Sequence, residues 1–280
     1  MPVKYAVFSA DANPHYSFPL PLAAAAWMRH GFTPLFLRIG EGWEAPKPAL
    51  SLRALSAMGA KVVNVPIQSL WSTEQFAKTA RLLAWVACSE DDYLLTTDAD
   101  MVLLDKSHVD SPDWGKAFHV FYANAYYTVN RNVWPICYLG ARAQFWRDLI
   151  GIGLAGYRPS TISDGTNRLL GRWADEGVAK LGRAGGRTPF SDEHILAMLV
   201  NCCPEFPHAF DLRTREENQP QFPARRVQRD CCMVDRPIDF HLPEDAWAKW
   251  NEIRPILYRI LSEEQQRQLS AYHTEYMSHA

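Results

Sequence analysis

Two aspartates separated by one alanine, Asp98 and Asp100, are the residues of this chain best suited to do chemistry. They follow a short apolar segment, Asp92–Leu95, whose aromatic and branched side chains are typical of a buried strand. Charge at the end of a buried strand is costly unless it is neutralised, and carboxylate oxygens are preferred ligands of hard cations. The pair therefore indicates a cation site, with the capping of a turn or of the next helix as the alternative.

The elements that position this pair alternate between strand and helix. Before it, strands are expected at 3–9, 33–39 and 61–67 and helices at 22–29, 48–58 and 72–88. After it, strands are expected at 118–122 and 134–141, with a short strand before His241 within 236–243. Helices are expected at 142–150, 165–180, from 191, 244–260 and 262–277. This alternation predicts an α/β fold with a mainly parallel sheet and helices on both faces. The loop after the first strand would then open at the same sheet edge as the aspartates, where ligands of such folds bind.

Composition excludes several classes of protein. The chain has 280 residues, 48% of them hydrophobic, which is enough for one large core. Its 29 Lys and Arg against 31 Asp and Glu argue against nonspecific nucleic-acid binding and against a polybasic membrane patch. No stretch approaches the roughly 20 apolar residues of a membrane span, and no secretory signal is apparent. We therefore expect a cytoplasmic protein whose six cysteines are reduced.

The segment Leu-Leu-Thr-Thr-Asp-Ala-Asp-Met-Val resembles the DXD segment of nucleotide-sugar-dependent glycosyltransferases of the GT-A type. The order of the later motifs resembles that of glycogenin-like and bacterial galactosyltransferase-like enzymes. The resemblance implies a GT-A fold, with a Rossmann-like, mainly parallel sheet flanked by helices. It implies a catalytic domain over residues 1–243 and a C-terminal helical extension over 244–280 packed on it. Asp98 and Asp100 would hold Mn²⁺ or Mg²⁺ against the donor diphosphate.

The same resemblance implies donor contacts before the aspartates. Asp11, Asn13 and Tyr16 resemble the loop that holds the nucleotide base and ribose. An Asx turn beside a half-buried tyrosine would explain these residues equally well. Lys78 and Arg81 lie at helical spacing and resemble basic residues that touch the donor, although a solvated helix face is the simpler explanation.

Four residues later in the chain complete the resemblance. Gly140 lies between a strand and a helix, like the family segment that faces the transferred sugar, or it serves only as a turn. Asp192 and Glu193 resemble an acidic pair that acts on the acceptor hydroxyl or lies beneath the sugar, but acids in the first turn of a helix also stabilise it. His241 resembles the late histidine that completes the metal site, although the glycine and lysine that usually follow are absent.

Together these motifs imply a metal-dependent glycosyltransferase that moves a sugar from a nucleoside-diphosphate-sugar to a carbohydrate or other hydroxyl acceptor. The resemblance favours a UDP-sugar as donor. A nucleotidyltransferase that makes sugar nucleotides is the second enzyme class, but Ser9–Pro14 lacks the glycine-rich, basic loop that such enzymes carry. A nucleotide-sugar-binding module without catalysis is the third reading.

Overall fold

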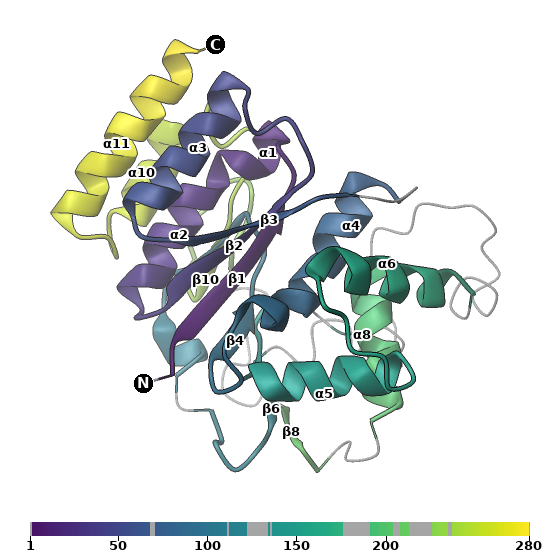
Figure 1. The fold of residues 1–280 in the computed structure, drawn as a ribbon. Coiled ribbons are helices and arrows are strands. Elements are labelled where there is room, and N and C mark those ends of the chain that lie inside the picture. The colour runs from purple at the N-terminus through teal and green to yellow at the C-terminus, as the bar shows by residue number, and fades with distance from the viewer. Residues whose placement is uncertain are drawn as a thin grey trace.

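The computed structural model describes residues 2–67, 71–110, 112–121, 134, 136–175, 191–203, 208–212, 226–234 and 237–279. Its centre is a seven-stranded sheet with the order β3-β2-β1-β4-β7-β6-β8 (Figure 1). The strands are β1 (Lys4–Ala10), β2 (Thr33–Ile39), β3 (Lys61–Val65), β4 (Tyr93–Thr96), β6 (Phe118–Val120), β7 (Leu139–Arg142) and β8 (Phe210–Leu212). Only β7 runs antiparallel to its neighbours among these strands. The predicted mainly parallel sheet is confirmed.

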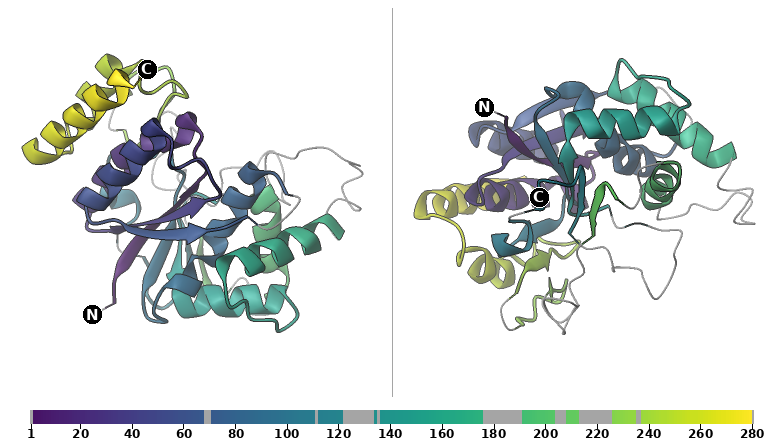
Figure 2. Two further views of the ribbon diagram at one scale, coloured as in Figure 1. Left: turned by 45° about the horizontal axis from the view of Figure 1, so that its top comes forward. Right: turned by 90° about the horizontal axis from the view of Figure 1, so that it is seen from below.

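Helices cover both faces of this sheet (Figures 1 and 2). One face carries α1 (Pro14–Ser17), α2 (Pro19–Arg29), α3 (Pro46–Ala57), α10 (Trp250–Leu257) and α11 (Glu263–Ser278). The other carries α4 (Thr73–Ala80), the 3₁₀ helix η1 (Arg81–Ala87), α5 (Ala143–Gly153), α6 (Ile162–Trp173) and α8 (Ser191–Asn201). The short 3₁₀ helix η2 (Lys106–His108) follows the strand β5 (Met101–Leu103). No helix in the described ranges combines the length and apolarity needed to cross a bilayer.

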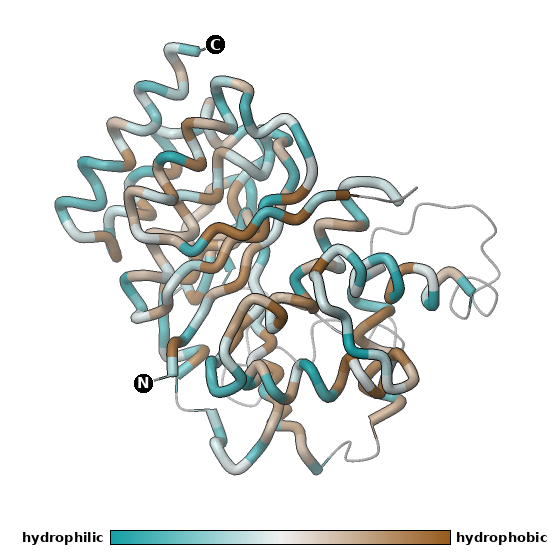
Figure 3. Tube along the Cα trace, in the orientation of Figure 1, coloured by the Kyte–Doolittle hydropathy of each residue, from teal (hydrophilic) through white to brown (hydrophobic). Residues whose placement is uncertain are grey.

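Side chains of the central strands alternate between two hydrophobic cores. In β1, Ala6 and Phe8 pack with the helices of the first face, while Tyr5 and Val7 pack with those of the second. Successive side chains of a strand point to opposite faces, so a sheet that is covered on both sides needs apolar residues at nearly every position. Figure 3 shows hydrophobic colour in the middle of the central strands.

A second, three-stranded sheet joins distant parts of the chain. It contains β5 (Met101–Leu103), β9 (Arg226–Val227) and β10 (Asp239–His241), in the order β5-β10-β9. Strand β10 runs antiparallel to β5 and parallel to β9, and His241 is opposite Met101 in the register. The chain after β10 continues this contact, since the Leu242 N–H donates to the Asp100 carbonyl at 2.8 Å.

Several predicted boundaries were wrong, and each has a local cause. Helix α2 begins at Pro19, three residues earlier than expected, because proline is tolerated in a first helical turn, where its missing N–H is not needed. Helix α6 also begins early, since the Thr161 side chain accepts from the Asp164 N–H at 3.1 Å and caps it. The expected helical residues 176–180 and strand residues 122, 135 and 236 lie outside the described part.

Two predicted helices are interrupted. The helix expected over 72–88 is α-helical only to Ala80 and continues as the 3₁₀ helix η1 from Arg81. The helix expected over 244–260 begins at Trp250. Before it, the chain turns tightly, because the Ala246 and Ala248 N–H groups donate to carbonyls only three residues back.

The structure gives Gly140 a role different from the predicted one. Gly140 lies opposite Leu95 in the β4–β7 pairing, and a Cβ added there would overlap the Tyr93 hydroxyl. That hydroxyl forms a 3.1 Å hydrogen bond with His119 Nδ1. Gly140 therefore makes room for a packed tyrosine, which corrects the prediction that it faces a transferred sugar.

We expect Gly140→Ala to destabilise the protein by about 1–3 kcal/mol, because Tyr93 must move to admit the new methyl group. Urea unfolding of wild type and variant measures this. Gly151→Ala is the matched control, since Gly151 lies in α5 with nothing within 4 Å of an added Cβ. That control should be neutral or slightly stabilising. Equal stability of Gly140→Ala and wild type would contradict this account of the β4–β7 contact.

Candidate functional site

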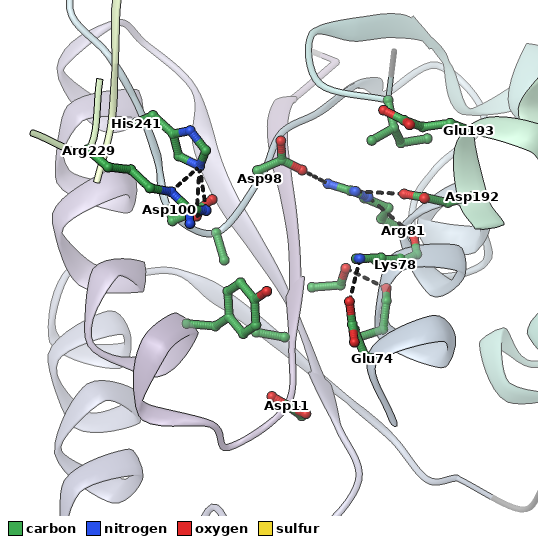
Figure 4. Close-up of a pocket in the computed structure, with 16 residues that line it drawn as sticks. Asp11, Glu74, Lys78, Arg81, Asp98, Asp100, Asp192, Glu193, Arg229 and His241 are labelled. Atoms are coloured by element: carbon green, nitrogen blue, oxygen red, sulfur yellow. Dashed lines mark hydrogen bonds and ion pairs between the residues drawn. The ribbon is translucent and has the colours of Figure 1, made fainter. Parts of the chain in front are cut away.

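A cavity of about 320 Å³ opens where β1 and β4 end. Nine of the eleven site residues predicted from the sequence line it: Asp11, Tyr16, Lys78, Arg81, Asp98, Asp100, Asp192, Glu193 and His241. Asn13 and Gly140 do not. The side chains of Glu74 and Arg229, which were not predicted, also line it. The residues come from elements on both faces of the central sheet and from the small sheet (Figure 4).

The two aspartates sit in a turn that follows β4 directly. The Thr97 N–H donates to the Val7 carbonyl at 3.0 Å, which extends the pairing of β4 with β1 by one residue. The Met101 N–H then donates to the Asp98 carbonyl at 3.2 Å and closes the turn into β5. This places the aspartate pair at the carboxyl edge of the parallel strands, as expected.

Asp100 and His241 meet although 141 residues separate them in the sequence. The cause is the β5–β10 pairing, which begins one residue after Asp100 and puts His241 at the end of β10. Asp100 Oδ2 and His241 Nε2 lie 3.1 Å apart. Their side chains are 11% and 25% exposed, so both are reachable from the cavity.

Arg229 is a site residue that sequence reasoning missed. Its guanidinium Nη2 lies 3.2 Å from Asp100 Oδ2 and 2.9 Å from His241 Nε2. Its Nη1 donates to Glu244 Oε1 at 2.5 Å. Arg229 follows β9, and this strand has only two residues, so no hydrophobic pattern marked it. The only available signal was an arginine twelve positions before the candidate histidine.

Arg81 is buried between two carboxylates. Its side chain is 6% exposed, its Nη1 pairs with Asp98, and its Nη2 lies 2.7 Å from Asp192 Oδ2. Nη1 also donates to the Thr97 carbonyl at 3.0 Å. Arg81 thus links the first helix turn of α8 to the turn that carries the aspartates. The predicted contact of Arg81 with a donor stays a prediction.

The charges in this group stabilise one another. Burial alone would lower the pKa of the Arg81 guanidinium, but Asp98 and Asp192 raise it above its ordinary value. Burial would also raise the pKa of Asp98, but attraction to Arg81 outweighs it and the net shift is downward. Asp98 is therefore held ionised.

Asp192 and Glu193 are not solvated helix-capping acids. Their residues are 2% and 7% exposed, and both line the cavity from the first turn of α8. Asp192 Oδ2 is occupied by Arg81. Glu193 lies beside it on the cavity wall (Figure 4). The two neighbouring acids therefore have different surroundings.

In the first loop, only part of the prediction agrees with the structure. The Asn13 side chain accepts from the His15 N–H at 3.1 Å and caps α1, so the Asx-turn alternative explains it and it does not reach the cavity. Asp11 and Tyr16 do line the cavity. Burial raises the pKa of Tyr16, and the nearby negative charge of Asp100 raises it further.

Lys78 lies on the cavity wall opposite the small sheet. It pairs with Glu74 at 2.6 Å, and the two side chains are 27% and 54% exposed. Among the described residues, the cavity lining carries six carboxylates, from Asp11, Glu74, Asp98, Asp100, Asp192 and Glu193. The permanently cationic residues of this described lining are Lys78, Arg81 and Arg229. Negative side chains therefore outnumber positive ones in the described lining.

Part of the site fits a divalent cation. Within the described ranges, no three His, Cys, Asp or Glu side chains converge where they could hold a metal ion. Figure 4 shows why: Asp98 points toward Arg81, while Asp100, His241 and Arg229 form a separate group. Two neighbouring ligands of an octahedral ion lie about 3 Å apart, which matches the 3.1 Å between Asp100 Oδ2 and His241 Nε2. A cationic group, the Arg229 guanidinium, already binds this pair.

Comparison with known proteins identifies the fold. No protein-family model matches the sequence, and no curated protein matches it. Among solved structures, the glycosyltransferase GlyE of Streptococcus pneumoniae TIGR4 superposes with a TM-score of 0.53 at 17% identity, over 99% of this chain and 64% of that one. The galactosyltransferase LgtC, solved with donor and acceptor sugar analogs, gives 0.52 at 14% identity, over 95% and 100%. The chain has the GT-A glycosyltransferase fold. It spans less than two thirds of the length of GlyE.

Within this GT-A fold, we expect Arg81→Ala to cost about 3–5 kcal/mol of unfolding free energy, because it leaves the buried Asp192 and the partly exposed Asp98 without their partner. Chemical denaturation measures the loss. Arg53→Ala is the control: it removes an arginine–glutamate pair whose side chains are 63% and 52% exposed, and should cost less than about 1 kcal/mol. A similar small loss for both variants would mean that the buried pairs do not hold α8 against the aspartate turn.

Proposed function

We propose that this protein is a metal-dependent glycosyltransferase that uses a nucleoside-diphosphate-sugar as donor and a hydroxyl group as acceptor. The observation that carries the proposal is the meeting of Asp98, Asp100 and His241 at one cavity, at the carboxyl edge of a GT-A sheet. The three residues come from two distant segments. The similarity to LgtC, which was solved with donor and acceptor sugar analogs, supports both kinds of substrate.

The cation would be Mn²⁺ or Mg²⁺, held by Asp100 and His241, with Asp98 completing the set from the other side. When bound, it would neutralise the charge that develops on the departing nucleoside diphosphate. Asp98 could act as a metal ligand because its pairing with Arg81 fixes its position and keeps it ionised. The excess of carboxylates in the cavity lining supports a requirement for a cation before a diphosphate can bind.

The donor would lie between the first loop and α4. Asp11 and Tyr16 stand where the base and ribose would bind, and a UDP-sugar is the favoured donor. Lys78, 27% exposed on the opposite wall, supplies positive charge for the phosphates. Residues 244–280 we treat as an extension of the same domain, because α11 shares the core of α2.

The reaction would proceed by attack of the acceptor oxygen on the anomeric carbon. The new bond forms between these atoms, and the bond from the anomeric carbon to the phosphate oxygen breaks. We propose that Glu193, which lines the cavity, is the base that accepts the proton of the acceptor hydroxyl. Asp192 is the poorer candidate, because its Oδ2 would have to leave Arg81 first. Asp192 then serves to position Arg81 and, through it, Asp98.

A panel of nucleotide sugars with and without Mn²⁺ tests the function. We expect one donor, most readily a UDP-sugar, to raise the melting temperature only with the metal, and to release its nucleoside diphosphate slowly in the absence of acceptor. Incubation with a sugar phosphate and UTP or GTP separates the alternative, since a nucleotidyltransferase would release pyrophosphate. Tight donor binding with no turnover would instead favour a binding module.

We expect Asp100→Asn to fold normally and to lose donor turnover at ordinary Mn²⁺ concentration, because a carboxylate ligand is replaced by a weaker amide oxygen. Release of the nucleoside diphosphate measures the loss, and circular dichroism checks the fold. Asp110→Asn is the control, because Asp110 is 47% exposed and is not part of the cavity lining. Wild-type turnover by Asp100→Asn would overturn the proposed metal site.

Glu193→Gln should lower kcat roughly 10²–10⁴-fold with little change in donor binding, since it removes the proposed proton acceptor while keeping the side-chain shape. Asp192→Asn should instead lower the unfolding free energy, because Arg81 loses a buried partner. Steady-state kinetics and urea titration of both variants distinguish the two roles. The assignment fails if Asp192→Asn loses more kcat than Glu193→Gln while remaining as stable as wild type.

A further inference from the structure

The Arg229 guanidinium sits among three acceptors on the cavity wall. Nε and Nη2 lie 3.2 Å and 2.9 Å from His241 Nε2, and Nη2 lies 3.2 Å from Asp100 Oδ2. Nη1 donates to Glu244 at 2.5 Å. A guanidinium has donors only, so the tautomer that leaves Nε2 of His241 unprotonated offers its lone pair to Arg229. In that tautomer the lone pairs of Asp100 and His241 are both directed at one positive group.

A divalent cation at this point needs the same two lone pairs. Asp100 Oδ2 and His241 Nε2 are 3.1 Å apart, the spacing of neighbouring metal ligands, and the guanidinium approaches both from the cavity. The single lone pair of His241 Nε2 cannot bind both cations, and like charges at this point repel strongly at a few ångströms. Arg229 and the metal must therefore exclude one another.

The structure allows Arg229 to leave. Its side chain is 42% exposed, unlike Arg81 at 6% and Arg226 at 13%, which are fixed in buried pairs. Its third partner, Glu244, is 68% exposed and is not a proposed metal ligand. A guanidinium released from Asp100 and His241 thus stays tethered at the rim of the cavity.

A diphosphate is the partner that would favour this release. The phosphate groups of the donor would lie beside the metal, within reach of an arginine at the rim, and arginine binds phosphate through paired charge-assisted hydrogen bonds. The phosphate oxygens of the donor would thus replace Asp100 and His241 as acceptors for Arg229, and Asp100 and His241 would then be available to the metal.

We propose that Arg229 is an internal occupant of the cation position that makes metal binding and diphosphate binding depend on each other. Without donor, Arg229 holds Asp100 and His241 and weakens metal binding. With donor, it binds the diphosphate and frees both ligands. The proposal rests on the proposed function. By thermodynamic linkage, the metal must strengthen diphosphate binding by the same factor as the diphosphate strengthens metal binding.

The test is titration of Mn²⁺ into wild type and Arg229→Gln, with free Mn²⁺ read by electron paramagnetic resonance. UDP is the probe, and its own binding of Mn²⁺ is measured separately and subtracted. We expect Arg229→Gln to bind Mn²⁺ alone at least about tenfold more tightly than wild type. UDP should strengthen Mn²⁺ binding in wild type at least about tenfold more than in the variant. Arg254→Gln is the control, an exposed arginine of α10 outside the cavity, and should match wild type.

Two results would overturn the proposal, and they differ in meaning. If Asp100→Asn abolishes Mn²⁺ binding but Arg229→Gln binds Mn²⁺ alone no more tightly than wild type, the metal site stands and the role of Arg229 is wrong. If wild type, Asp100→Asn and Arg229→Gln all fail to bind Mn²⁺ even with UDP, both the proposed function and the proposed role of Arg229 are wrong. Thermal unfolding of each variant confirms that it is folded.

Discussion

The site depends on the neutralisation of negative charge at the carboxyl edge of β4. Carboxylates crowd there, and a carboxylate in a partly buried place is costly without a cation. Three of the described arginines supply this charge from two segments: Arg81 of η1 pairs with Asp98 and Asp192, and in the segment of β9 Arg226 pairs with Asp239 and Arg229 with Asp100. Arg81 is buried, Arg226 is 13% exposed, and Arg229, at 42%, is the most exposed of the three. The architecture fixes two charges and leaves the third able to move.

The Arg226–Asp239 pair fixes the position of the strand that carries His241. Asp239 is fully buried in β10, receives two hydrogen bonds of 2.9 Å from Arg226, and accepts a third from the Tyr138 hydroxyl at 3.0 Å. Tyr138 adopts a φ of 64°, which is uncommon for a residue with a side chain. These contacts join β9, β10 and the chain before β7. They set the position of His241, two residues after Asp239.

The sequence predicted what depends on local pattern. The strands β1 and β2 were placed within a residue, because apolar runs bounded by turn residues are a local signal. The Asp98 and Asp100 turn followed from the same reasoning, and the order of motifs added His241, Asp192 and Glu193 to the candidate site.

Contacts between residues that are far apart in the chain could not be predicted from the sequence. The β5–β10 pairing joins short strands that carry no pattern of their own, so the contact of Asp100 with His241 rested on resemblance alone. Arg229 lies after a two-residue strand and was invisible for the same reason. Gly140 was misassigned because its neighbour Tyr93 comes from another strand, and Asn13 because a cap and a ligand contact use the same amide oxygen.

The β5–β10 pairing also has a consequence for biosynthesis. A chain still emerging from the ribosome holds the two aspartates of the first half long before β10 is made. Contacts between segments so far apart form late, since the intervening chain must first be ordered. The nascent protein therefore exposes half of the proposed cation site, and the imidazole arrives only when the small sheet closes. The proposed site is in that sense complete only after β10 has been made and paired.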